Sequence, residues 1–124
     1  MAWNFDDNRP IYSQLVEILE TKIVSGEYQP GAKLPSVREL AITAAVNPNT
    51  MQRAFSELER EGLVNTNRTS GRTVTEDPNM LRQVRSQLAR GHVDYFFKKM
   101  KELGYTNQEI TSLANEAASK EDNQ

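Results

Sequence analysis

The 124-residue sequence has no cysteine and only one histidine, which limits the chemistry that it can support. Without cysteine there is no disulfide framework, thiolate nucleophile or cysteine-based metal site. His92 is the single histidine, so the usual nitrogen and sulfur ligands of transition metals are scarce. We therefore expect neither a metal nor another cofactor, and we interpret His92 as an ordinary helix residue.

Long hydrophobic runs are also missing. No stretch approaches the ~18 apolar residues of a membrane span, and residues 1–7 are acidic rather than apolar. We expect no secretory signal, no membrane association and a cytoplasmic location. The length allows one domain, or one small domain with an appendage, and 37% hydrophobic residues indicate a folded chain with a thin core.

No arrangement of residues suggests catalysis. Asp6 with Asp7, and Glu59 with Glu61, are acidic pairs without a nucleophile or second catalytic group placed beside them. Ser36 is explained as a helix cap, and the sequence has no Gly-x-Ser-x-Gly turn. We predict that the protein is not an enzyme.

The net charge of −2 at first argues against nucleic acid as a partner, because contacts to phosphate need lysine and arginine. The field of a local patch matters more than the total charge, however. The direction in which the arginines point therefore decides the question.

Caps and apolar periodicity predict three helices, followed by a hairpin. The helices cover 10–25, 36–43 and 48–61, with a capping box at Ser36 and Glu39 and an N-cap at Asn47 before Pro48. Two β-prone segments, 63–66 and 73–75, surround the turn-rich residues 67–72. The expected fold is mainly α with a small β-hairpin wing.

A long apolar stripe then predicts a helix from Pro78 to Gly104, and a capping box at Thr106 and Glu109 begins another. Glycine costs about 1 kcal/mol relative to alanine inside a helix, so Gly91 is the point where this helix would bend or break. We predict a winged helix-turn-helix domain over residues 9–77 and a short two-helix dimerisation segment over 78–124.

The third helix has two faces of different character. Met51, Ala54, Phe55 and Leu58 fall on one face and should be buried, with the polar residues Asn49, Gln52, Arg53, Ser56 and Arg60 opposite. Arginine pairs with guanine edges, and asparagine and glutamine pair with adenine edges. Asn49, Gln52 and Arg53 are the expected base readers, and Thr50 could reach phosphate. An ordinary solvated helix face is the alternative at this point.

Three longer segments resemble the GntR family of bacterial regulators. They are Gly31–Ala41 (GAKLPSVRELA), Val46–Phe55 (VNPNTMQRAF) and Leu58–Val64 (LEREGLV). The Asn-Pro-Asn-Thr opening of the third helix, the Pro-Ile-Tyr lead-in at Pro10 and the short helical C-terminus are similar to the YtrA-like subfamily. That subfamily carries a small dimerisation segment in place of a large effector-binding domain.

The resemblance implies a set of DNA contacts. Arg38 would contact phosphate or a base at the groove edge, and Arg68, Gly71 and Arg72 would lie in the wing, at the minor groove. The major-groove contacts implied by the family are Asn47, Asn49, Thr50, Gln52 and Arg53. The sequence departs from the family at Ala45, where a glycine is common, and in the wing at Thr69 and Thr73.

Apolar residues of the last helices are expected to join two copies of the chain. The candidate dimerisation residues are Leu81, Val84, Leu88, Tyr95, Phe96 and Met100. These features together predict a transcriptional regulator that binds a palindromic double-stranded DNA operator as a homodimer, and the resemblance implies a repressor. Two alternatives stay open. One is a winged-helix protein-interaction module, and the other is a regulator with an aromatic pocket for an unknown small-molecule effector, lined by Tyr95, Phe96 and Phe97.

Overall fold

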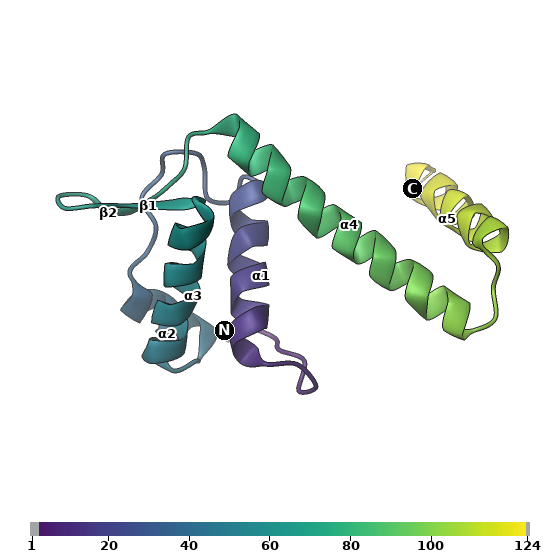
Figure 1. Cartoon of the computed structure of the whole chain (residues 1–124), viewed down its shortest axis with the longest axis horizontal. Coiled ribbons are helices and arrows are strands. Elements are labelled where there is room, and N and C mark those ends of the chain that lie inside the picture. The colour runs from purple at the N-terminus through teal and green to yellow at the C-terminus, as the bar shows by residue number, and fades with distance from the viewer. Residues whose placement is uncertain (1–2, 124) are drawn as a thin grey trace. The chain divides into compact units, whose positions relative to one another are not determined.

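The computed structural model describes residues 3–123, which form five helices and one β-hairpin (Figure 1). The helices are α1 (Ile11–Val24), α2 (Val37–Ala44), α3 (Pro48–Glu61), α4 (Pro78–Glu102) and α5 (Asn107–Asp122). The strands are β1 (Val64–Asn67) and β2 (Gly71–Val74). The mainly α fold with a hairpin wing is therefore confirmed.

The chain divides into two compact units, one ending at Ser86 and the other beginning at Gln87. This division falls inside α4, later than the boundary between residues 77 and 78 predicted from the sequence. The reason is that the start of α4 takes part in the first unit, where Val84 is only 5% exposed. A helix start and a domain boundary are thus separate features in this chain.

The core of the first unit lies between α1, α2 and α3, and both α1 and α2 pack against α3 (Figure 1). Leu15, Leu19 and Ile23 supply the buried face of α1, and Leu40 and Ala44 supply that of α2. The apolar residues recur every three or four positions, so each helix turns one stripe inward. The fully buried Phe55 is the largest of the central side chains.

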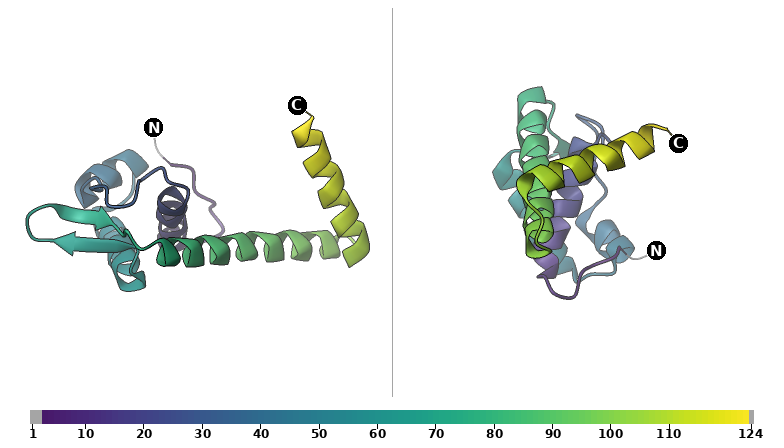
Figure 2. Two further views of the ribbon diagram at one scale, coloured as in Figure 1. Left: turned by 90° about the horizontal axis from the view of Figure 1, so that it is seen from above. Right: turned by 90° about the vertical axis from the view of Figure 1, so that its right-hand side faces the viewer.

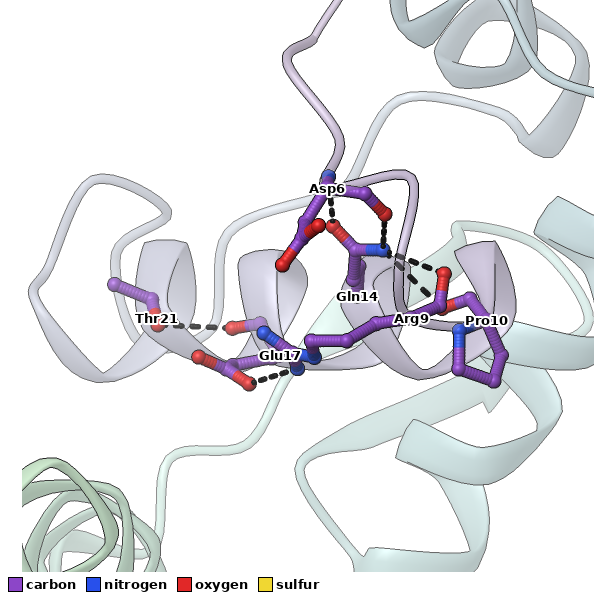
Figure 3. A network of polar contacts seen from close by, with 6 residues as sticks. All are labelled: Asp6, Arg9, Pro10, Gln14, Glu17 and Thr21. Atoms are coloured by element: carbon purple, nitrogen blue, oxygen red, sulfur yellow. Dashed lines mark hydrogen bonds and ion pairs between the residues drawn. The ribbon is translucent and has the colours of Figure 1, made fainter. Parts of the chain in front are cut away.

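The segment before α1 is held in place by one buried glutamine. The Gln14 side-chain amide donates to the backbone oxygens of Asp6 at 2.8 Å and Arg9 at 2.9 Å, and its oxygen accepts from the Asp6 amide at 2.7 Å (Figure 3). Arg9 also pairs with Glu17 at 3.1 Å. Because a buried amide must find partners, Gln14 fixes the route of the chain into α1.

The wing is an antiparallel hairpin that is joined by a third stretch of backbone. Val64 pairs with Val74 and Asn67 pairs with Gly71, so the connecting turn contains only residues 68–70 and is shorter than predicted. Gly71, the first residue of β2, follows this turn with φ of 75°, a left-handed conformation that favours glycine. The Leu34 amide donates to the Arg72 carbonyl at 2.9 Å, which ties the loop before α2 to β2.

The second unit contains the later part of α4 and all of α5. The helix continues through Gly91, so the possible break that the sequence left open at this residue does not occur (Figure 2). Gly104, with φ of 95°, follows the end of α4, and the predicted capping box at Thr106 and Glu109 opens α5. Ile110 is fully buried. Among the described residues, no helix combines the length and apolar character needed to cross a membrane.

Candidate DNA-binding surface

The third helix has the local structure that its sequence predicts. The Asn47 side chain caps α3 by accepting a hydrogen bond from the Asn49 amide at 2.7 Å, and Pro48 occupies the first helical position. Gly62 ends the helix in the left-handed conformation, with φ of 88°. Met51 and Phe55 are completely buried, as are Ala54 and Leu58, so the predicted inner face is confirmed.

The opposite face of α3 presents amide, hydroxyl and guanidinium groups to solvent. Asn47, Asn49, Gln52 and Arg53 are exposed, and Thr50 is half-buried. The Gln52 amide makes one long contact, at 3.5 Å, to the Ser56 hydroxyl on the same face. Arg60, near the end of the helix, forms an ion pair with Glu57. The five residues predicted to face the major groove are therefore all at least partly accessible to solvent.

The turn between α2 and α3 sets the angle at which this surface is presented. The Val46 amide donates to the Ala41 carbonyl at 3.0 Å and the Ala45 amide to the Ile42 carbonyl at 3.2 Å, the two bonds of a Schellman motif. Ala45 adopts φ of 60° and ψ of 49°. An alanine thus occupies a left-handed position that favours glycine, the residue that is common here in the family.

Arg38 lies on the exposed side of α2. It is the second residue of a helix whose start is fixed by the capping box, in which the Ser36 hydroxyl accepts from the Glu39 amide at 3.1 Å. Arg38 has no ion-pair partner within residues 3–123. Its guanidinium can therefore contact an external anion without breaking an internal contact.

The two wing arginines are placed differently. Arg68 is exposed in the turn of the hairpin, beside Gly71 at the start of β2. Arg72 instead points back toward α3, where its Nε lies 2.6 Å from the Glu59 carboxylate and its guanidinium lies over the Phe55 ring. In the protein alone Arg72 attaches the wing to α3, which leaves Arg68 as the accessible wing arginine.

Sequence reasoning did not identify Tyr12 or Glu59 as parts of this surface. The Arg53 guanidinium lies over the Tyr12 ring, 4.4 Å from its centre. Glu59 holds Arg72, as described above, although its position alone indicates only a solvated flank. Both contacts join residues from different elements, and no spacing rule within one helix could have found them.

Two carboxyl groups meet where α1 packs against the end of α3. Burial and the neighbouring carboxyl of Glu61 raise the pKa of Glu20 to about 8, and the charges of Glu17 and Glu57 act in the same direction. One oxygen of Glu61 is buried without a hydrogen-bond partner among the described groups. At neutral pH Glu20 is therefore mainly protonated, so its side chain adds no negative charge beside Glu61.

The predicted dimerisation residues fall into three classes. Tyr95 and Phe96 are exposed, at 61% and 38%, whereas Leu81, Leu88 and Met100 are half-buried. Val84 does not fit the prediction, because it is already buried within its own chain and cannot offer surface to a partner. His92 is exposed on α4. Residues 3–123 contain no cluster of three histidine or acidic side chains that could hold a metal ion.

A capped helix with an exposed polar face, the second of a helix-turn-helix pair and flanked by a β-hairpin, defines a winged helix-turn-helix DNA-binding protein. Residues 11–74 match the family model of bacterial regulatory proteins of the gntR family. The chain belongs to the GntR family of DNA-binding transcriptional regulators.

Two similar proteins come from Bacillus subtilis (strain 168). The HTH-type transcriptional regulator YhcF is 43% identical over 106 residues, which is 86% of this chain and 88% of YhcF. The HTH-type transcriptional repressor YtrA is 37% identical over 94 residues, which is 76% of this chain and 68% of YtrA.

The fold is similarly close to solved structures. A GntR family transcriptional regulator from Listeria monocytogenes has a TM-score of 0.81 and 40% identity, with 90% of this chain and 98% of that chain covered. The N-terminal domain of AraR, solved in complex with mutant ORR3, has a TM-score of 0.52 and 27% identity, with 56% of this chain and 100% of that chain covered. These proteins are transcription regulators, in agreement with the prediction of a non-enzymatic role.

Proposed function

We propose that the protein is a homodimeric repressor that binds a two-fold-symmetric operator with one α3 helix in each of two successive major grooves. The exposed polar face of α3 is the observation that carries this proposal. Asn49 and Gln52 suit adenine and Arg53 suits guanine, and each good bidentate pair contributes about 1–3 kcal/mol of discrimination. Two copies of α3 would lie about 34 Å apart, one turn of the double helix.

Backbone contacts would orient the protein on the duplex. Arg38 and the half-buried Thr50 would contact phosphate beside the major groove, and the wing would bring Arg68 to the neighbouring minor groove. Contact of the Gly71 backbone with the groove is part of the same proposal. Arg72 could reach DNA only by leaving Glu59, so we assign it a weaker part in binding.

The second unit supports the homodimer because it exposes several large apolar side chains. Val93 is 53%, Leu103 is 73% and Tyr105 is 40% exposed, in addition to Tyr95 and Phe96. Exposed large apolar side chains, where they gather, mark protein interfaces. We propose that Leu81, Leu88, Tyr95, Phe96 and Met100 contribute to a dimer contact, and that Val84 does not.

Repression is proposed from the relative YtrA, whose name states that it is a transcriptional repressor. A dimer bound across an operator would exclude the transcription machinery, which acts in the bacterial cytoplasm. A small-molecule effector stays a prediction. The exposed positions of Tyr95 and Phe96 favour subunit contact over an enclosed aromatic pocket, because the wall of a pocket would bury them.

The first test is selection of tight-binding duplexes from a random DNA pool by the purified protein, at low and moderate salt. We expect a two-fold-symmetric motif with half-sites about one helical turn apart. The variant Arg53→Ala should relax the preference at one position in each half-site, whereas Ser13→Ala on α1 is a matched exposed control. Failure to enrich any sequence would refute operator binding and favour the protein-interaction alternative.

The dimer is tested separately by sedimentation of the protein without DNA. The double variant Tyr95→Ser with Phe96→Ser should shift the protein from dimer to monomer at micromolar concentration. Val93→Ser alone should have a smaller effect. A wild-type protein that sediments as a monomer at all concentrations would contradict the proposed assembly.

A further inference from the structure

Arg53, one of the predicted base readers on α3, lies against an aromatic ring from another helix. Its guanidinium carbon is 4.4 Å from the centre of the Tyr12 ring, which comes from the first turn of α1. Tyr12 is half-buried and Arg53 is exposed, so the guanidinium lies on the ring and stays accessible to solvent. A residue outside the helix-turn-helix pair thus contacts the proposed recognition face.

This contact leaves the hydrogen-bonding groups of Arg53 available. Arg60 and Arg72 are occupied by the carboxylates of Glu57 and Glu59, which accept their N–H groups. Arg53 has no ion pair among residues 3–123, and the π face of a ring attracts the cation without using a carboxylate or carbonyl acceptor. The donors that pair with guanine therefore remain free.

The ring also restricts a side chain that is otherwise flexible. A guanidinium must present two parallel N–H groups to the O6 and N7 atoms of guanine, so its orientation decides whether the pair forms. An arginine that is free in solution loses rotamer freedom when it binds, and this loss opposes recognition. Contact with Tyr12 removes part of that freedom before DNA arrives.

We propose that Tyr12 is a positioning residue for base recognition, which holds the Arg53 guanidinium ready to pair with a guanine of the operator. The inference rests on the proposed function of α3, but it assigns to α1 a part in sequence specificity. Tyr12 acts through Arg53 and need not touch a base itself. Its contribution should therefore appear in the discrimination between bases rather than in overall attraction to DNA.

Four variants test whether the Tyr12 ring acts through Arg53. Tyr12→Phe keeps the π face and removes the hydroxyl group, whereas Tyr12→Leu keeps apolar bulk for packing and removes the π face. Arg53→Ala removes the partner, and Tyr12→Leu with Arg53→Ala completes a double-mutant cycle. Ile11→Ala, at the exposed neighbouring position on α1, is the matched control for a change in that helix.

The measurement is the ratio of affinities for the selected operator and for an operator changed at the base that Arg53→Ala identifies, together with the salt dependence of each affinity. We expect Tyr12→Leu to reduce this ratio about two- to fivefold, the range of an exposed cation–π contact. Tyr12→Phe and Ile11→Ala should retain the ratio, and Tyr12→Leu should have no further effect in Arg53→Ala. The salt slope should stay constant, because no phosphate contact is removed.

Two outcomes would overturn the inference while leaving operator binding intact. In the first, the wild type selects a motif but Tyr12→Leu keeps the full ratio. In the second, Tyr12→Phe weakens binding as much as Tyr12→Leu for every sequence, which would indicate a hydroxyl contact to phosphate. A wild type that selects no motif would refute the proposed function itself. Thermal unfolding of each variant confirms that the folded state is being compared.

Discussion

Replacing Ala45 by glycine should stabilise the protein, because this alanine is held in a left-handed conformation with φ of 60° and ψ of 49°. The crowding between Cβ and the following carbonyl oxygen costs an L-residue about 1–2 kcal/mol in this region. Glycine avoids that cost but loses about 0.5–1 kcal/mol of additional backbone entropy on folding. The net gain is then about 0.5–1 kcal/mol.

Nothing else in the turn should change. The two Schellman hydrogen bonds are made by backbone atoms, and Ala45 is exposed, so removing its methyl group sacrifices little burial. In a domain of 60–100 residues, 1 kcal/mol corresponds to a shift of about 4–8 °C in Tm. We expect Ala45→Gly to raise the Tm by about 2–8 °C in thermal unfolding followed by circular dichroism, at one fixed protein concentration.

Two control substitutions test the reasoning in the opposite direction. Gly104→Ala introduces Cβ at φ of 95° into open space, so it should destabilise the second unit through backbone conformation alone. Ala89→Gly, exposed within α4, should also destabilise, by about 1 kcal/mol. If Ala45→Gly lowers the Tm as Ala89→Gly does, the left-handed residue is not strained and the argument is wrong.

Three further predictions follow from other sites. Glu20→Gln should raise stability by about 1 kcal/mol above pH 8 and have little effect below pH 4.5. The raised pKa means that the contribution of Glu20 to wild-type stability is greatest in acid and is lost as pH rises from 4.5 through about 8, and partial exposure screens the effect. Denaturant titrations at pH 4.5, 6 and 8.5 test this, and a parallel decline in both proteins would refute it. Gly91→Ala should stabilise α4 by about 1 kcal/mol, because a Cβ there meets no other atom within 4 Å; an unchanged or lower Tm would contradict this. Arg38→Ala should weaken binding to all sequences alike and reduce the salt slope by about 1, and a loss confined to one base position would instead make Arg38 a base reader.

Local chemistry made much of the fold predictable. Ser36, Asn47 and Thr106 were identified as caps because their side chains satisfy amides only a few residues away, and the structure contains all three caps. The buried face of α3 followed from periodicity alone, with Met51 and Phe55 both completely buried. These features depend on residues within one or two helical turns.

Contacts between elements were not predictable in this way. The ion pair of Arg72 with Glu59 and the packing of Arg53 on Tyr12 depend on how separate elements meet. The burial of Val84 has the same origin, since its apolar stripe gives no sign of which surface covers it. The continuity of α4 through Gly91 shows that a single unfavourable residue need not interrupt a long helix.

Asn49 and Gln52 have a property that matters beyond the recognition of one sequence. Their exposed side chains make no hydrogen bond to any other element within residues 3–123, and the apolar face of α3 lies on the opposite side. Replacing either residue should therefore alter which bases the protein prefers, while the fold is retained. After gene duplication, single substitutions at these two positions can change the DNA sequence that one copy prefers without unfolding the protein. Arg53, which lies on Tyr12, is less independent, and a change there is more readily accommodated together with a change in α1.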